Sequence, residues 1–248
     1  MIIDAHTHLM AGPGQPLPSL DAFVDGLHSF GDDKAILFTY EGLWGDPRAG
    51  NDALAEAAAR YPKVLYPCCS AHPRDGEGAL RELHRCAHEL GMVGVKLHPW
   101  MQSIAATDAA TIAFVREAAA LGLPVVFHDG TPPFSDTAQV AYVAEQVPTA
   151  KVVLGHAGLG NFWPLAIQAA QRFANVYLLV CGPPPLGLRQ MAQKVGVRRM
   201  LWGSDYPFGG LEAPVYSLAK VQTLPLGDEE TAWVLHRSAE ALFPALAR

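Results

Sequence analysis

The sequence predicts an α/β protein whose strands and helices close into a (β/α)8 TIM barrel. Short β-branched runs alternate along the chain with alanine-rich stretches whose apolar residues recur at helical spacing, which is typical of parallel βα units. Eight such runs occur in 248 residues, half of which are hydrophobic, and this is enough to build the core of one barrel. We therefore predict a single domain over residues 1–248.

Predicted strands and helices follow one another along the whole chain. The strands are expected near residues 1–5, 35–39, 64–69, 93–97, 123–127, 151–155, 175–180 and 199–203. The helices are expected at residues 20–30, 52–61, 77–90, 108–121, 137–146, 162–173, 188–195 and 228–242. Asp108 can cap the start of a helix, and Gly91 and Gly122 lie where a helix must stop. Pro124 prevents the preceding helix from continuing into the fifth strand.

Stretches rich in proline and glycine are predicted to be loops. They are residues 11–18, 42–50, 98–103, 130–134, 182–187 and 207–214. Most of them follow the end of a predicted strand, which is the side on which barrels of this kind build their active sites. We interpret them as βα loops and not as linkers between domains.

Composition argues against several classes of partner. The chain has 24 acidic and 18 basic residues, so it lacks the basic surface that nucleic acid requires. No apolar run reaches the roughly 18–20 residues needed to cross a bilayer, and no signal-peptide pattern is present. The four cysteines show no CxxC pairing, as expected of reduced thiols. We predict a cytoplasmic protein with a small-molecule substrate, and the sequence is compatible with a homodimer.

Two histidines end the first predicted strand and are candidates for metal binding. Because side chains alternate along a strand, His6 and His8 should point the same way. Ile3, Ala5 and Thr7 should then lie on the opposite face. The two imidazoles are therefore expected to converge on one ion.

Two further candidate ligands follow later strands. His128 ends the fifth apolar run and Asp205 follows the eighth, so a barrel would bring both to the same mouth as His6 and His8. Three imidazoles and one carboxylate suit Zn²⁺, with Mn²⁺ or Fe²⁺ as alternatives. The alternative for Asp205 is a helix cap or turn residue. We predict one divalent metal ion per chain, bound by His6, His8, His128 and Asp205.

Catalytic and substrate-binding roles are assigned to residues at other predicted strand ends. Glycines flank His156 on the run 155–158, so we predict that it exchanges a proton with substrate or metal water. Its alternatives are a fifth ligand or a structural loop histidine. Lys96 and His98 share one face of the fourth strand and are predicted to bind substrate. A carbamylated Lys96 bridging two metals is the alternative.

Aromatic residues in the predicted loops could form the walls of a small pocket. We expect Trp100 and Tyr206 to contact substrate, with Trp44 and Phe208 beside them. The alternative for each is packing.

These motifs together resemble the amidohydrolase superfamily, in the branch that includes aminocarboxymuconate-semialdehyde decarboxylase and pyrone-dicarboxylate lactonase. The matching elements are Asp4-Ala5-His6-Thr7-His8, Gly94-Val95-Lys96-Leu97-His98-Pro99, Val126-Phe127-His128, Gly155-His156-Ala157-Gly158, Gly203-Ser204-Asp205-Tyr206-Pro207 and Ala241-Leu242-Phe243. The resemblance implies a metal-dependent barrel in which His156 matches the catalytic histidine. It also implies that Asp205 has two roles, as a ligand and as a base on metal-bound water.

The amidohydrolase superfamily contains both hydrolases and nonoxidative decarboxylases, so this resemblance does not decide the reaction. This chain is shorter than typical decarboxylase relatives, and it keeps the His-x-His pair where some of them have glutamate first. Both features favour hydrolysis. We therefore predict a metal-dependent hydrolase in which metal-activated water attacks a small amide, ester or lactone. The alternatives are a metal-dependent decarboxylase of a small carboxylic acid and, less favoured, a metal-dependent nuclease or a metal-binding barrel without catalysis.

Overall fold

The computed structural model describes residues 1–9, 19–208, 210 and 212–247. Eight parallel strands form one sheet in the order of the sequence, which confirms the predicted (β/α)8 barrel. The strands are β1 (Ile3–Leu9), β2 (Lys34–Thr39), β3 (Leu65–Cys69), β4 (Gly94–Leu97), β5 (Val125–Phe127), β6 (Val152–Leu154), β7 (Val176–Leu179) and β8 (Met200–Leu201).

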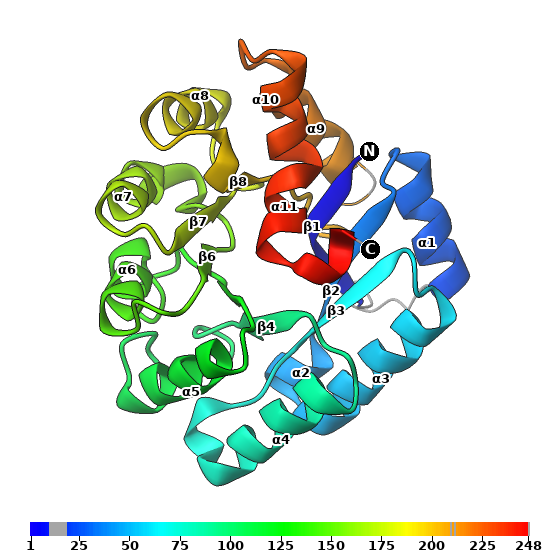
Figure 1. Cartoon of the computed structure of the whole chain (residues 1–248), viewed down its shortest axis with the longest axis vertical. Coiled ribbons are helices and arrows are strands. Elements are labelled where there is room, and N and C mark those ends of the chain that lie inside the picture. Colours follow the sequence, from blue (N-terminus) through cyan, green and yellow to red (C-terminus); the bar gives the residue numbers. More distant parts are fainter. Residues whose placement is uncertain (10–18, 209, 211, 248) are drawn as a thin grey trace.

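The helices form a ring outside the strands (Figure 1). They are α1 (Leu20–Ser29), α2 (Glu41–Trp44), α3 (Pro47–Arg60), α4 (Glu77–His88), α5 (Ala109–Ala120), α6 (Thr137–Gln146), α7 (Leu159–Arg172), α8 (Pro185–Lys194), α9 (Glu212–Gln222), α10 (Asp228–Ala232) and α11 (Ser238–Leu242). A short π-helical segment, Trp233–Arg237, joins α10 to α11. As predicted, the Asp108 side chain caps α5 by accepting a hydrogen bond from the backbone N–H of Ala110.

Some predicted loops are helical in the structure. The stretch 42–50 contains most of α2 and the start of α3. Asp46 caps α3, and Pro47 occupies its first turn, where a missing N–H costs nothing. The helix α9 was not predicted at all, since Pro214 in its first turn was interpreted as a loop residue. The predicted loop 182–187 also ends early, because α8 begins at Pro185. The predicted loop 11–18 lies outside the described residues.

The seam between β8 and β1 is joined only in part. No regular ladder pairs these two strands in the described chain, in contrast to the seven other neighbouring pairs. Instead, the backbone N–H of Ala5 donates to the Trp202 carbonyl at 3.1 Å, and that of His8 donates to the Tyr206 carbonyl at 2.8 Å. Backbone hydrogen bonds across the seam therefore fix the His8 end of β1 to the loop that follows β8.

A bulge in β1 changes which of its side chains face the barrel interior. The pairing with β2 shifts register between Asp4 and Thr7, so one extra residue is inserted there. Ile3 and Ala5 consequently pack inside the barrel, on the same side as His6 and His8. The prediction from strict alternation, which placed Ile3 and Ala5 on the opposite face, is wrong for this reason.

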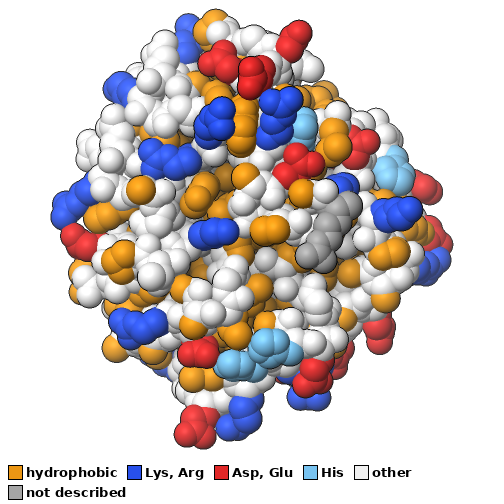
Figure 2. Space-filling model, in the orientation of Figure 1, with side chains coloured by type: hydrophobic (Ala, Val, Ile, Leu, Met, Phe, Trp, Pro, Cys, Tyr) orange, Lys and Arg blue, Asp and Glu red, His pale blue; other side chains and the backbone are white. Residues whose placement is uncertain are grey.

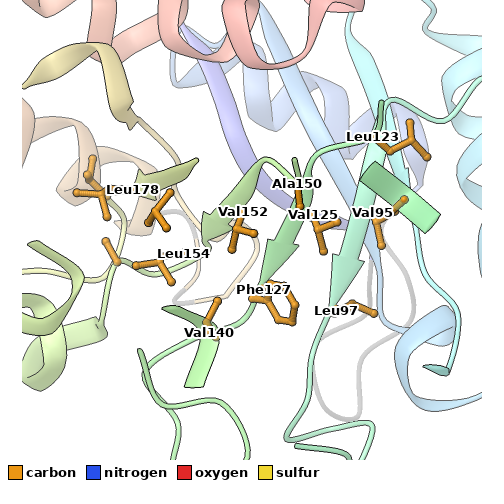
Figure 3. Close-up of a cluster of buried hydrophobic side chains, with 14 of the residues drawn as sticks. Val95, Leu97, Leu123, Val125, Phe127, Val140, Ala150, Val152, Leu154 and Leu178 are labelled. Atoms are coloured by element: carbon orange, nitrogen blue, oxygen red, sulfur yellow. The ribbon is translucent and has the colours of Figure 1, made fainter. Parts of the chain in front are cut away.

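Apolar side chains fill two separate regions. Residues on the outer face of the strands, including Val95, Phe127 and Val152, pack against the surrounding helices (Figure 3). Inward-facing residues of the strands form a second cluster with the C-terminal segment, to which Leu242, Phe243 and Leu246 belong. That second cluster is the inner core. α11 lies in front of β1 in Figure 1, so the C-terminal segment closes this end of the barrel.

No helix in the described part of the chain is long and apolar enough to span a membrane. On the face drawn in Figure 2, lysine and arginine side chains are interspersed with aspartate and glutamate.

Candidate active site and metal centre

Three predicted metal ligands meet at the C-terminal mouth of the barrel. The Nε2 atom of His8 lies 3.1 Å from Asp205 Oδ1, and the Nε2 atom of His6 lies 3.4 Å from the same oxygen. The ligand atoms of these three residues all lie within 4.8 Å of one another. Ligands that each bind one ion at about 2.0–2.2 Å have such spacings. The donor set therefore fits a divalent metal ion.

The hydrogen bonds of His6 favour metal binding through one particular nitrogen. Its Nδ1 atom lies 2.9 Å from the backbone carbonyl of Gly155, which can only accept, so Nδ1 carries the ring proton. The lone pair then lies on Nε2, which faces His8 and Asp205. Metal-binding histidines are commonly held in this way by a hydrogen bond from the other ring nitrogen.

Burial keeps the histidines of the cluster neutral. It lowers the pKa of His6 well below the ordinary value, and it lowers the pKa of His8 although Asp205 opposes the shift. For His128, burial and then the nearby Lys96 lower the pKa to about 3. A neutral imidazole has the lone pair that a metal ion needs. The site is therefore ready to bind a cation at neutral pH.

Asp205 adopts a backbone conformation that side chains usually avoid. Its φ is +67°, in the left-handed region that favours glycine. A hydrogen bond of 2.9 Å from its backbone N–H to the His6 carbonyl holds it there. Strain at a polar residue in a cluster of this kind is an indication of function.

His128 lies beside this cluster, and its Nδ1 atom faces another histidine. That nitrogen is 2.8 Å from Nε2 of His156, and the ring stacks on His98 with centroids 3.8 Å apart. His128 does not belong to the group of ligand atoms gathered by His6, His8 and Asp205. Its Nε2 is the ring nitrogen not used by His156.

His156 differs from the prediction because both of its ring nitrogens have partners within the protein. Nε2 faces His128, and Nδ1 lies 3.2 Å from the Sγ atom of Cys181. This arrangement leaves neither nitrogen available to substrate in the structure. Cys181 was interpreted from the sequence only as a reduced thiol, and nothing in its spacing marks it as a partner of His156.

Lys96 is buried among the histidines. Its Nζ atom lies 3.1 Å from Nε2 of His6 and 4.8 Å from the centre of the Phe38 ring. Burial lowers the pKa of Lys96 to about 8, while Asp205 is the largest opposing influence. At pH 7 the ammonium form still predominates, so Lys96 supplies a positive charge inside the mouth.

Two buried carboxylates that the sequence reasoning missed hold the site in place. Asp129 accepts hydrogen bonds of 2.8 Å from the backbone N–H groups of His156 and Gly158. Asp4 accepts hydrogen bonds of 3.0 Å from the backbone N–H groups of His6 and Ser204. Burial raises the pKa of Asp129 to about 6 and that of Asp4 to about 7. Asp129 directly follows His128, and Asp4 lies two residues before His6, which is the only signal the sequence offered.

The predicted aromatic walls are only partly where we expected them. Tyr206 is 7% exposed and packs against Phe23 of α1 and against Phe30, which follows the end of that helix, at centroid distances of 5.3 and 5.7 Å. The structure thus places Tyr206 in the core, and we withdraw its substrate-binding role. Trp100 lies 52% exposed in the turn after β4, and Trp44 is exposed as well.

A better aromatic wall surrounds His8. The Tyr40 ring lies 5.4 Å from the His8 ring, and the Phe208 ring lies 5.2 Å from both. Burial, and secondarily the charge of Asp205, raise the pKa of Tyr40 to about 12. Tyr40 therefore stays a neutral phenol. The sequence reasoning missed it because it follows β2 without a recognisable motif.

Known proteins similar to this chain include several decarboxylases. Gamma-resorcylate decarboxylase from Rhodococcus jostii (strain RHA1) is 26% identical over 179 residues, and the match covers 67% of this chain and 50% of that protein. The chain thus spans about half the length of this curated relative. Two solved structures share the fold. They are 5-carboxyvanillate decarboxylase from Sphingomonas paucimobilis (TM-score 0.76, 17% identity, 98% of each chain covered) and a dihydroxybenzoic acid decarboxylase from Polaromonas sp. JS666 with bound manganese and 2-nitroresorcinol (TM-score 0.78, 19% identity, 100% of this chain and 97% of that chain covered).

These comparisons contradict the predicted hydrolysis. The curated relative and these structures are decarboxylases, so the findings favour the alternative reaction. Chain length and the His-x-His pair, on which the prediction of hydrolysis rested, therefore did not indicate the reaction of the similar proteins. A divalent metal is supported, whereas zinc in particular is not, since one of these structures holds manganese.

The family itself is established by a match along almost the whole sequence. The family model described as amidohydrolase, Amidohydro_2, matches residues 3–245. This range contains every strand of the barrel and all the histidines of the site. The resemblance seen in the sequence motifs is therefore confirmed, and the chain belongs to the Amidohydro_2 family of amidohydrolases.

Proposed function

We propose that the protein is a metal-dependent, nonoxidative decarboxylase of a small aromatic acid that carries a phenolic hydroxyl group. The observation that carries this proposal is the 26% identity to gamma-resorcylate decarboxylase over two thirds of the chain. The shared fold of two further decarboxylases of hydroxylated benzoic acids agrees with it. The substrate class is taken from the names of these proteins.

In this proposal, His6, His8 and Asp205 hold one divalent ion, with His128 as a fourth ligand through Nε2. A carboxylate and imidazoles suit Mn²⁺ as well as Zn²⁺, and manganese is bound in one of the related structures. When bound, the ion supplies positive charge for the carboxylate and phenolic oxygens of the substrate.

Lys96 and His98 are proposed to bind the substrate. An ion on His6 Nε2 would take the lone pair that now accepts a hydrogen bond from Lys96, and the ammonium could then turn to an anionic oxygen. His98 stacks on His128, and its Nδ1 lies 3.4 Å from the backbone N–H of Met101. Its Nε2 would then carry the proton and could donate it to a substrate oxygen.

The substrate ring is proposed to lie against Tyr40 and Phe208. Their rings flank His8, and offset or edge contacts with a further aromatic ring are favourable. Trp100, more exposed at the rim, would cover the outer side. These contacts would select a flat aromatic acid over an aliphatic one.

Asp205 is proposed to move the proton. In decarboxylation the bond between the ring carbon and the carboxylate breaks, CO2 leaves, and the ring carbon takes up one proton. The Asp205 carboxylate lies at the mouth and is partly exposed, so it can first accept the proton of the substrate's phenolic hydroxyl group and then deliver it to the ring carbon as CO2 leaves. The phenolate that results takes up a proton from water. His156, whose ring nitrogens both have protein partners, is proposed to act on His128 instead.

The test is an assay of purified protein loaded with Mn²⁺ against gamma-resorcylate, 5-carboxyvanillate and other hydroxybenzoates. We expect release of CO2 together with the corresponding phenol, and no turnover in the His8→Ala variant. Metal-loaded, folded protein that releases no CO2 from any hydroxybenzoate of the panel would refute the proposal. Turnover of benzoates that lack the hydroxyl group would refute the substrate class.

A further inference from the structure

A continuous series of contacts connects β7 to the histidines of the mouth. The Sγ atom of Cys181 lies 3.4 Å from the Gly155 carbonyl and 3.2 Å from Nδ1 of His156. The other nitrogen of His156 lies 2.8 Å from Nδ1 of His128. Cys181 lies two residues after the end of β7, whereas His156 and His128 follow β6 and β5. Three neighbouring strands thus contribute one residue each.

Hydrogen-bond chemistry allows only one direction along this series if His128 is to bind a metal ion. For Nε2 of His128 to keep a lone pair, Nδ1 must carry the proton and donate it to His156. Nε2 of His156 is then an acceptor, so its Nδ1 carries the proton and donates it to the sulfur of Cys181. The thiol proton is then directed to the Gly155 carbonyl.

The Gly155 carbonyl is therefore the common end point of two series. It accepts from Nδ1 of His6 at 2.9 Å and, through sulfur, it also receives the series that begins at His128. A carbonyl oxygen has two lone pairs and can accept both hydrogen bonds. The same backbone atom would thereby fix the protonated nitrogen of two imidazoles.

The backbone around Cys181 is held rigidly. Lys220 donates hydrogen bonds to the backbone carbonyls of Cys181 and Pro183. A Cβ atom on Gly182 would lie 2.4 Å from the His156 carbonyl, so only glycine permits this close approach of the two loops. The sulfur is consequently presented to His156 by two independent constraints.

A second interpretation of the same atoms is a metal site, since His6, His156 and Cys181 also offer ligand atoms within 4.8 Å of one another. The hydrogen bonds argue against it. A neutral imidazole has one lone pair, and that of His6 lies on Nε2, 3.4 Å from Asp205. His6 cannot serve both groups at once.

We infer that Cys181 is a positioning residue, which fixes the tautomer and orientation of His156 and, through it, of His128. The inference rests on the proposed function in one respect, namely that His128 is a metal ligand. It requires a side chain at position 181 that can both accept a hydrogen bond from His156 and donate one to Gly155. Serine meets this requirement, and alanine does not.

The experiment compares Cys181→Ala with Cys181→Ser. Titration with Mn²⁺ and Co²⁺ should show metal affinity about 10–100-fold weaker in the alanine variant, as is typical when a partner of a metal-binding histidine is lost. Nitrogen NMR of the metal-free protein should show a single tautomer of His156 in the wild type and a mixture in the alanine variant. The serine variant should resemble the wild type in both measurements.

Cys86→Ala serves as a matched control, because Cys86 is a buried cysteine in α4 and should leave both measurements unchanged. Unaltered affinity and tautomer in Cys181→Ala would overturn the inference. A sulfur-to-cobalt charge-transfer band in the wild type would also overturn it, by showing that Cys181 is a ligand. Neither the metal titration nor the NMR measurement requires substrate. The role of Cys181 can therefore be tested even if the decarboxylase assay fails.

Discussion

The two ends of the barrel interior are built from opposite kinds of side chain. Toward the end closed by the C-terminal segment, the inner core contains apolar side chains such as Ile3, Ile36 and Phe243. Toward the mouth, the interior contains histidines, Lys96 and Asp205. In β1 the two regions meet at the bulge, where Ala5 belongs to the inner core and His6 to the mouth.

The closed end of the barrel interior therefore contributes mainly to stability, and the mouth contributes mainly to the candidate site. Apolar burial stabilises the closed end, while the mouth holds polar groups whose desolvation is costly unless they are paired. Buried carboxylates such as Asp4 and Asp129 provide that pairing for the backbone of the mouth. Substitutions in the two regions should therefore affect different measurements.

The largest effect is expected from His8→Ala. The substitution removes one of the three gathered ligands, so bound metal should fall sharply and decarboxylation should be abolished, while the barrel remains folded because its core lies elsewhere. Metal analysis, the CO2 assay and a melting curve provide the measurements. If the variant retained a full equivalent of metal and normal turnover, the mouth would not be the metal site.

Phe243→Ala tests the closed end of the barrel and should affect stability without affecting the candidate site. Phe243 is fully buried in the inner core, so its truncation should lower the free energy of unfolding by about 3–5 kcal/mol. Denaturant titration measures this change. Metal affinity and kcat of the molecules that remain folded should be unaltered, and a selective loss of metal at unchanged stability would contradict the prediction.

Asp32→Asn should change the pH dependence of stability without changing the site. Asp32 is 2% exposed, and neither carboxyl oxygen has a hydrogen-bond partner in the described structure. Burial, followed by the charges of Asp4 and Asp33, raises its pKa to about 9. The folded protein thus keeps a proton that the unfolded chain releases, so stability should fall as pH rises from about 4 to about 9.

The asparagine variant should lose this slope. Between pH 5 and pH 8 we expect the wild type to lose at least about 1.4 kcal/mol more than the variant, which is the equivalent of one pKa unit. Urea unfolding at a series of pH values gives the comparison. Asp25→Asn, at an exposed position of α1, is the control and should keep the wild-type slope.

The smallest effect is expected from Tyr206→Phe. Although Tyr206 adjoins Asp205 in sequence, its ring packs in the core against α1. The loss of the hydroxyl group keeps this ring packing, so it should change stability by about 1 kcal/mol or less. Steady-state kinetics should show unchanged kcat and KM. A marked rise in KM would return Tyr206 to the substrate pocket.

The candidate site was predictable where a short motif coincided with a strand end. His6, His8 and Asp205 were found because all parallel strands of a barrel end at one mouth, and the structure brings these three together. Tyr40, Cys181 and the buried carboxylates were missed. Their roles depend on contacts between neighbouring strands, and no local pattern in the sequence records such contacts.

By itself, the sequence determined the number, order and approximate bounds of the strands, because hydrophobic periodicity and helix-terminating residues act locally. It also indicated which polar residues lie at strand ends. Tertiary structure decided the bulge in β1, the packing of Tyr206 against α1 and the closure of one end by α11. These features depend on contacts between chain segments that are far apart in sequence, and such contacts form only when the barrel closes.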